Sequence, residues 1–185
     1  MKIPGSNEEG FIYTVVDSPI GELMIAGDER ALRLVSIQAG SSAIAPRPTW
    51  LRDDARFEVA LGQLREFLNG DRRAFDLAMA PVGTSFQLRV WEELCKIPYG
   101  ETISYAELSR RIGRSTSVRA VGAANGANPL PILVPCHRVI GADGALIGYR
   151  GGLRFKKFLL ALEASHSAPL FAHVAPLSAR SGSRA

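Results

Sequence analysis

The chain has 185 residues, of which 46% are hydrophobic and 22% are charged, which is typical of a globular protein and excludes both a large multidomain assembly and wholesale disorder. Its two cysteines and three histidines are too few for a disulfide framework or a cysteine-rich zinc site, so we expect a reducing compartment, no metal and no cofactor. No apolar run approaches the roughly 20 residues of a membrane-spanning helix, and the start of the sequence lacks a signal-peptide pattern. We therefore expect a cytoplasmic protein with no membrane partner.

The formal net charge of +4 is distributed unevenly along the chain. Residues 1–80 carry 9 Lys and Arg against 12 Asp and Glu, a net charge of −3, whereas residues 81–185 carry 13 against 6, a net charge of +7. The basic half suits a polyanionic partner such as nucleic acid, although a basic surface is often only solvated charge.

The first predicted elements are three short antiparallel strands within residues 11–37, where β-branched and apolar runs are separated by the turn sequences DSPIG and AGDER. Residues 38–50 are rich in Gly, Ser and Pro and predict a loop. Residues 53–71 have apolar side chains at helical spacing, with acidic residues at their start and Asn69-Gly70 at their end. They predict one amphipathic helix.

The sequence becomes basic and helical after residue 80. A helix is predicted to begin at Ser85, its capping residue, and to end before Pro98. Residues 105–126 predict a helix-turn-helix with its turn at Gly113. A last amphipathic helix is predicted over residues 154–164.

These patterns indicate an α+β protein with two domains. Residues 1–80 are expected to form a small N-terminal domain of a three-stranded antiparallel sheet and a helix, and residues 81–165 a mostly helical C-terminal domain that contains the helix-turn-helix. Residues 166–185 are rich in Ser and Ala and are expected to be a flexible tail.

The two cysteines differ in their surroundings. Cys95 follows Leu94 in an apolar helix, where we expect it to pack. Cys136 lies in Pro135-Cys136-His137, and a thiol beside an imidazole can be converted to a thiolate near neutral pH. Successive side chains of an extended segment point to opposite faces, so communication between thiol and imidazole requires a bend or a bridging water. The isolated pair is compatible with a catalytic or a structural role.

The sequence around this pair resembles the active-site region of the O6-alkylguanine-DNA alkyltransferases. The resemblance rests on VPCHRVIG, on RAVGAANGANPLPIL before it, and on GYRGGL followed by Lys156 and Glu163 after it. The upstream run TSFQLRVWEELCKIPYGETISYAEL is also similar to that family, so the resemblance is dense over residues 84–163 and looser in the N-terminal domain.

The resemblance implies repair of DNA by direct damage reversal. The alkyl group would pass from O6 of guanine, and also from O4 of thymine, to a cysteine of the protein in a single displacement that consumes the protein. The partner would be double-stranded DNA carrying O6-alkylguanine, bound by a monomer of the stand-alone type. The N-terminal four-cysteine zinc module of the regulatory relatives has no counterpart in this sequence.

Site residues follow from the same resemblance. Cys136 would accept the alkyl group, His137 would act on its thiol through a water, and Glu163 would orient the imidazole. Asn125 would link the recognition helix to the active-site loop.

The pocket would be lined by Tyr149 together with backbone groups of Cys136, Val139 and Arg150. The carbonyls of Cys136 and Val139 would accept from the exocyclic amine of guanine, and Lys156 would support Tyr149 electrostatically. Relatives often have a small residue at the position of Arg150, so we expect this long cation to affect the access of bulky alkyl groups.

The lesion lies inside a duplex and has to be flipped out to reach a buried cysteine. The resemblance implies that Arg119 fills the gap in the base stack and that Tyr105 assists rotation of the phosphate and contacts the flipped base. Small residues on the recognition helix would allow close approach to the minor groove, and basic residues on the preceding helix would contact phosphates. The remaining residues of this predicted interface are Ala120, Gly122, Ala123, Arg110 and Arg111.

Three other functions are compatible with parts of the sequence. The first is a non-catalytic alkyltransferase-like protein that flips damaged bases, although such relatives have another residue in place of the cysteine. The second is a helix-turn-helix transcription regulator, based on residues 105–126 and the basic half. The third is a cysteine hydrolase that uses Cys136 and His137 over many turnovers.

Overall fold

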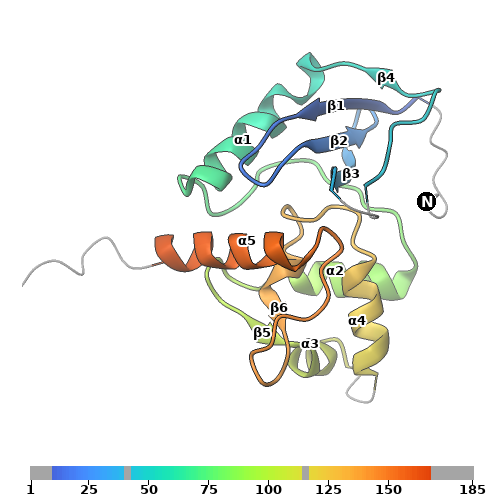
Figure 1. Cartoon of the computed structure of the whole chain (residues 1–185). Coiled ribbons are helices and arrows are strands. Elements are labelled where there is room, and N and C mark those ends of the chain that lie inside the picture. The colour runs from blue at the N-terminus through green and yellow to red at the C-terminus, as the bar shows by residue number, and fades with distance from the viewer. Residues whose placement is uncertain (1–9, 40–42, 114–116, 168–185) are drawn as a thin grey trace, which may run out of the picture.

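The computed structural model describes residues 10–39, 43–113 and 117–167 (Figure 1). The N-terminal unit is a four-stranded sheet of order β3-β2-β1-β4. β1 (Ile12–Val16), β2 (Leu23–Gly27) and β3 (Leu32–Ile37) form the predicted antiparallel meander. β4 (Leu51–Arg52) pairs in parallel with β1, so the sheet is mixed and the expectation of only three antiparallel strands was wrong.

The fourth strand has a simple physical origin. It is two residues long, and the amides of Leu51 and Asp53 donate to the carbonyls of Phe11 and Tyr13, each at 3.0 Å. A strand this short has no alternation of side chains to detect, because alternation needs several residues.

Each face of the sheet is covered. One face packs against α1 (Glu58–Asn69), whose side chains Leu64 and Phe67 are buried in the main hydrophobic core. A smaller core lies on the other face and includes Trp50, with Ile44 packed against it. The segment predicted as a loop thus shields the second face of the sheet.

The C-terminal unit is mostly helical, as predicted. It begins with α2 (Ser85–Leu94), followed by α3 (Tyr105–Arg111), α4 (Val118–Gly126) and α5 (Leu153–His166). The cap of α2 is Thr84, not Ser85: the Thr84 hydroxyl accepts from the amide of Gln87, and the Gln87 side chain accepts from the amide of Thr84. This reciprocal capping box places the cap one residue before the predicted one.

The α3 and α4 helices pack against each other and correspond to the predicted helix-turn-helix. Gly113 has a φ of 72°, a left-handed conformation that suits the start of a turn. A short parallel pair, β5 (Ile103–Ser104) and β6 (Val139–Ile140), joins the start of α3 to the segment after Cys136. Like β4, this pair is too short to have been predicted.

The two units are packed together. α5 runs along the boundary between them (Figure 1), and one hydrophobic core contains Phe67 of α1 together with Trp91 of α2 and Leu159 of α5. The amide of Val35 on β3 also donates to the carbonyl of Pro129 at 2.8 Å.

The ends of α2 and α5 differ from the sequence-based predictions. Cys95, expected to pack, is exposed at the end of α2, because the helix presents Leu94 to the core and the next position to solvent. α5 continues through His166, the first residue assigned to the tail, and residues 168–185 of that tail lie outside the described residues. Among the residues that the structure describes, no helix is both long and apolar enough to cross a bilayer.

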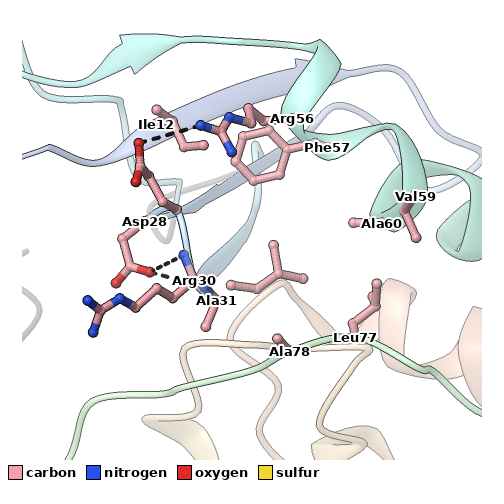
Figure 2. A pocket seen from close by; sticks show the side chains of 12 residues that line it. Ile12, Asp28, Arg30, Ala31, Arg56, Phe57, Val59, Ala60, Leu77 and Ala78 are labelled. Carbon is pink, nitrogen blue, oxygen red and sulfur yellow. Dashed lines mark hydrogen bonds and ion pairs between the residues drawn. The ribbon is translucent and has the colours of Figure 1, made fainter.

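The N-terminal unit has a surface pocket between the β2–β3 turn and the start of α1 (Figure 2). Arg56 lies 3.4 Å from Glu29 in this pocket, and the Asp28 carboxylate accepts from the backbone amides of Arg30 and Ala31. None of the candidate site residues lines this pocket.

Candidate active site

The predicted bend at the Cys-His pair is a single turn of 3-10 helix, η3 (Cys136–Arg138). The amide of Arg138 donates to the carbonyl of Pro135 at 3.0 Å and closes this turn. In a turn, successive side chains no longer point to opposite faces, so the thiol of Cys136 and the imidazole of His137 are not separated as they would be in a strand. Cys136 and His137 are 5% and 0% exposed.

Burial determines the resting state of the nucleophile. It raises the pKa of the Cys136 thiol to about 11, although Asn128 and Lys156 act in the opposite direction. The resting group is therefore a thiol, and its activation requires a base.

The residue after Cys136 belongs to a buried histidine–carboxylate pair. Nε2 of His137 is 2.8 Å from Oε1 of Glu163, which reaches it from α5. A carboxylate only accepts hydrogen bonds, so Nε2 holds the proton of the neutral ring and Nδ1 holds the lone pair. Nδ1 is buried and has no hydrogen-bond partner within the described part of the chain.

Burial also lowers the pKa of His137, although Glu163 acts against this effect. Glu163 itself remains ionised: hydrogen bonds from His137 and Arg138 hold its pKa at about 2 in spite of its burial. The pair thus combines a neutral imidazole with a fixed carboxylate, the arrangement of a general base and its orienting group.

Two asparagines hold the loop that carries the thiol. Nδ2 of Asn125, at the end of α4, donates to the carbonyl of Cys136 at 3.3 Å, which is the link expected from the sequence. Nδ2 of Asn128 donates to the carbonyl of Val134 at 2.9 Å, and its Oδ1 accepts from the amide of Leu130 at 3.0 Å. Ile132, which lies between Leu130 and Val134, has a φ of 77°, a strained value for a β-branched residue.

Lys156 is fully buried and fastens the glycine-rich loop, residues 147–152, to β6. Its Nζ donates to the carbonyl of Val139 at 2.6 Å and to that of Ile147 at 2.8 Å, and it lies 5.8 Å from the centre of the Tyr105 ring. The contacts of Lys156 are thus with two carbonyls and the Tyr105 ring. The Val139 carbonyl keeps a second lone pair for another donor.

Two tyrosines border the same region. The hydroxyl of Tyr105 donates to the carbonyl of Ile147 at 3.2 Å. The hydroxyl of Tyr149 is buried with no partner among the described residues, and burial raises the pKa of Tyr149 well above its usual value. The Tyr149 phenol therefore stays protonated and able to donate.

The glycine-rich loop also contacts the N-terminal unit. Arg150 is half-buried and lines a small cavity together with Ile44 of the N-terminal unit. At Gly151 a Cβ atom would lie 2.5 Å from Cδ1 of Ile37 on β3, so any larger residue would require the Ile37 side chain to shift.

The predicted DNA-binding residues of α4 lie on its accessible side. Arg119 and Ala123 are exposed, and Ala120 and Gly122 are partly exposed. The ring of Tyr105 lies 3.9 Å from the place where a Cβ of Gly122 would be. Residues 114–116, which precede α4 in the sequence, lie outside the described residues.

The two arginines predicted to contact phosphates lie at the end of α3. Arg110 is exposed and pairs with Glu107, and Arg111 pairs with the same carboxylate at 2.8 Å and approaches Glu93 of α2 at 4.0 Å. Arg111 is thereby held between α2 and α3.

The described residues contain no cluster of three or more His, Cys, Asp or Glu side chains that could hold a metal ion. The chemistry available at this site is that of a buried thiol, a neutral imidazole and a fixed carboxylate.

Two family models match the chain, one after the other. Residues 11–81 match the ribonuclease-like domain of 6-O-methylguanine DNA methyltransferase, and residues 85–165 match the DNA binding domain of 6-O-methylguanine DNA methyltransferase. The chain belongs to the 6-O-methylguanine DNA methyltransferase family. The family resemblance inferred from the sequence is thereby confirmed, as is the α+β fold.

Known relatives of this methyltransferase cover most of its length. The methylated-DNA–protein-cysteine methyltransferase of Methanosarcina acetivorans is 46% identical over 153 residues, which are 83% of this chain and 98% of the relative. The protein of the same description from Mycobacterium bovis is 46% identical over 156 residues, 84% of this chain and 93% of the relative. A crystal structure of Mycobacterium tuberculosis OGT in complex with DNA matches with a TM-score of 0.79 and 45% identity, over 84% of this chain and 94% of that chain.

Sequence reasoning missed two residues of the methyltransferase site. Arg138 is buried, and its Nε and Nη2 donate to Oε2 and Oε1 of Glu163, each at 2.9 Å. The amide of Gly100 donates to Oε2 of the same carboxylate at 2.9 Å. The available signal was the expected pairing of Glu163 with His137, because a carboxylate in a buried site requires donors and Arg138 is the cation nearest to His137 in the sequence.

Proposed function

We propose that Cys136 is the residue with which this methyltransferase repairs DNA, accepting the alkyl group from O6 of a guanine in a reaction that consumes the protein. The observation that carries this proposal is the buried thiol of Cys136 beside His137, whose Nδ1 lone pair is buried and unpartnered among the described residues. The curated relatives are named for transfer to a protein cysteine, and Cys95 is exposed at the end of α2 with no imidazole hydrogen bond among the described residues.

The chemical step needs one base and one leaving group. His137 takes the thiol proton at Nδ1 through a water, and the resulting imidazolium is stabilised by Glu163. Sγ of Cys136 attacks the alkyl carbon, so an S–C bond forms as the C–O6 bond breaks. The electron pair of the broken bond stays on the guanine, which takes up one proton and remains in the DNA as the normal base. The S–C bond of a thioether resists hydrolysis, so the thiol is not regenerated.

The pocket that receives the base is proposed to lie between η3 and the glycine-rich loop. The unpartnered phenol of Tyr149 supports a role as hydrogen-bond donor to the guanine edge. The carbonyls of Cys136 and Val139 are proposed to accept from the exocyclic amine. Arg150 is proposed to limit the size of the alkyl group from the side of the N-terminal unit.

DNA is proposed to bind on the face formed by α3 and α4. The small residues of α4 support close approach to a minor groove, and exposed Arg119 in its first turn is proposed to replace the flipped base in the stack. Arg110, at the exposed end of α3, is the better candidate of the two arginines for a phosphate contact. We further propose that the protein acts as a monomer without a cofactor in the cytoplasm, where Cys136 stays reduced, and that O4-alkylthymine is a second substrate.

The test is intact-protein mass spectrometry after incubation with an excess of duplex DNA containing O6-methylguanine. Wild type is expected to gain the mass difference of one methyl group for hydrogen, and to stop at one per chain. Cys136→Ala should gain nothing while still binding the lesion, and the matched control Cys95→Ala should react like wild type. A gain that persists in Cys136→Ala, or a wild type that binds the lesion without any gain, would overturn the proposal.

A further inference from the structure

One buried cation, Arg138, lies beside the proposed relay of Cys136, His137 and Glu163. The side chain of Arg138 is 8% exposed, and its guanidinium lies 5.7 Å from the centre of the Tyr99 ring. Its Nη1 donates to the carbonyl of Ile97 at 2.6 Å, and its other two nitrogens donate to Glu163. All three nitrogens are thus used inside the protein, and none is available for DNA.

Three groups donate hydrogen bonds to one carboxylate, that of Glu163. Glu163 accepts from Arg138 on one side and from His137 on the other, while the amide of Gly100 provides a further donor. Two parallel hydrogen bonds from a guanidinium fix the plane of a carboxylate. The oxygen that accepts from Nε2 is therefore held in place by Arg138.

The charges of these three buried side chains explain why a cation is needed beside Glu163. With His137 neutral, the positive charge of Arg138 and the negative charge of Glu163 cancel in a site where both side chains are buried. Without Arg138, the buried carboxylate would have only His137 as a neighbour able to compensate it, and burial would favour a proton on the ring. That proton would occupy Nδ1, the atom that must accept the thiol proton.

We propose that Arg138 is a positioning residue for alkyl transfer: it neutralises Glu163 and fixes its orientation, which keeps His137 uncharged and its Nδ1 free to serve as the base. This inference rests on the proposed roles of Cys136 and His137.

The other groups that face the imidazole are compatible with this role. From α5 they are Glu163 and Lys156, and from η3 it is Arg138; Tyr99 faces the carboxylate from the segment after α2. Lys156 and Arg138 both lower the pKa of His137, in the same direction as burial, and only Glu163 raises it. Arg138 differs from Lys156 in its direct contact with the carboxylate that would otherwise hold the ring protonated.

The first experiment measures the single-turnover rate of methyl transfer from O6-methylguanine duplex as a function of pH. In Arg138→Met the acid limb of the profile is expected to move to higher pH by about 1–3 units, the usual effect of one close charge on a buried group. Arg138→Lys keeps the charge and should leave the limb at the wild-type position, with a lower plateau because one of the two hydrogen bonds to Glu163 is lost.

The matched control is Arg33→Met. Arg33 also donates to a carboxylate, Asp28, and to a backbone carbonyl, that of Ala80 at 2.8 Å, but it lies on β3 away from the relay. Its acid limb should coincide with that of wild type. A limb in Arg138→Met that coincides with those of Arg33→Met and wild type would overturn the inference. No transfer by wild type at any pH would instead overturn the proposed function.

A second measurement needs no variant and decides the matter if Arg138→Met does not fold. ¹⁵N NMR of the imidazole in wild type should show a neutral ring protonated at Nε2 throughout the range around pH 6.5, roughly where an ordinary histidine is half protonated. A His137 ring that titrates at this ordinary value, or that carries its proton on Nδ1, would refute the role of Arg138.

Discussion

Replacement of Glu163 by Gln tests how much the buried relay contributes to both stability and rate. The two carboxylate oxygens accept from His137, Arg138 and the amide of Gly100. A glutamine offers one acceptor oxygen and one NH₂ group. Whichever way the amide is turned, its NH₂ group faces at least one donor, and the positive charge of Arg138 is left buried without a partner.

The cost follows from burial. Removal of one partner of a buried ion pair costs about 3–5 kcal/mol, and at about 2–4 °C of melting temperature per kcal/mol for a chain of this size, Glu163→Gln should melt about 6–20 °C below wild type. The rate should fall about 10²–10⁴-fold, the usual contribution of a general base, because the amide no longer fixes the tautomer of His137.

Glu107→Gln is the matched control for this prediction. Glu107 also accepts from two arginine side chains, Arg110 and Arg111, but its own side chain is 27% exposed. Water can replace those hydrogen bonds, so its loss of stability should be only about 0–1 kcal/mol. Urea denaturation gives the free energy of unfolding of both variants, and a loss in Glu163→Gln no greater than in Glu107→Gln would refute the argument from burial.

Three further predictions concern other parts of the molecule. S-methylation of Cys136 should lower the free energy of unfolding by about 1–3 kcal/mol, because it adds a methyl group to a packed site; identical melting curves before and after reaction would contradict this. Arg119→Ala should slow transfer from duplex DNA more than transfer from a free O6-alkylguanine base, and equal losses in the two rate assays would exclude its role in flipping. Acid should destabilise the protein in two steps. The pKa values of His137 and Glu163 in the folded protein lie below their ordinary values of 6.5 and 4.5. Each group therefore stabilises the fold above its ordinary pKa, and that stability is lost as the pH falls. Free energies of unfolding that do not fall between neutral and acidic pH would refute this last prediction.

The helices and the chemical centre were predictable from the sequence for different reasons. Helical spacing of apolar residues locates α1, α2 and α5, because burial of one face repeats over several turns. The pairing of His137 with Glu163 was expected only through the family resemblance, because no local pattern joins residues so far apart in the sequence.

What could not be predicted depends on contacts between distant segments. Strands β4 and β6 are two residues long and exist only because other strands lie beside them. The exposure of Cys95 results from the direction in which α2 ends relative to the core. Arg138 carries a charge, so sequence rules place it at the surface, and its burial is understandable only with Glu163 beside it.

The contact between Gly151 and Ile37 has a consequence for how this methyltransferase can change in evolution. The loop that borders the proposed lesion pocket lies against a side chain of the first sheet, so its position is set from behind by the N-terminal unit. A smaller residue at position 37 would give the loop room to retreat, and a larger one would press it toward the thiol. The range of lesions accepted can therefore drift through substitutions in a strand outside the proposed DNA face, while every reacting group stays the same.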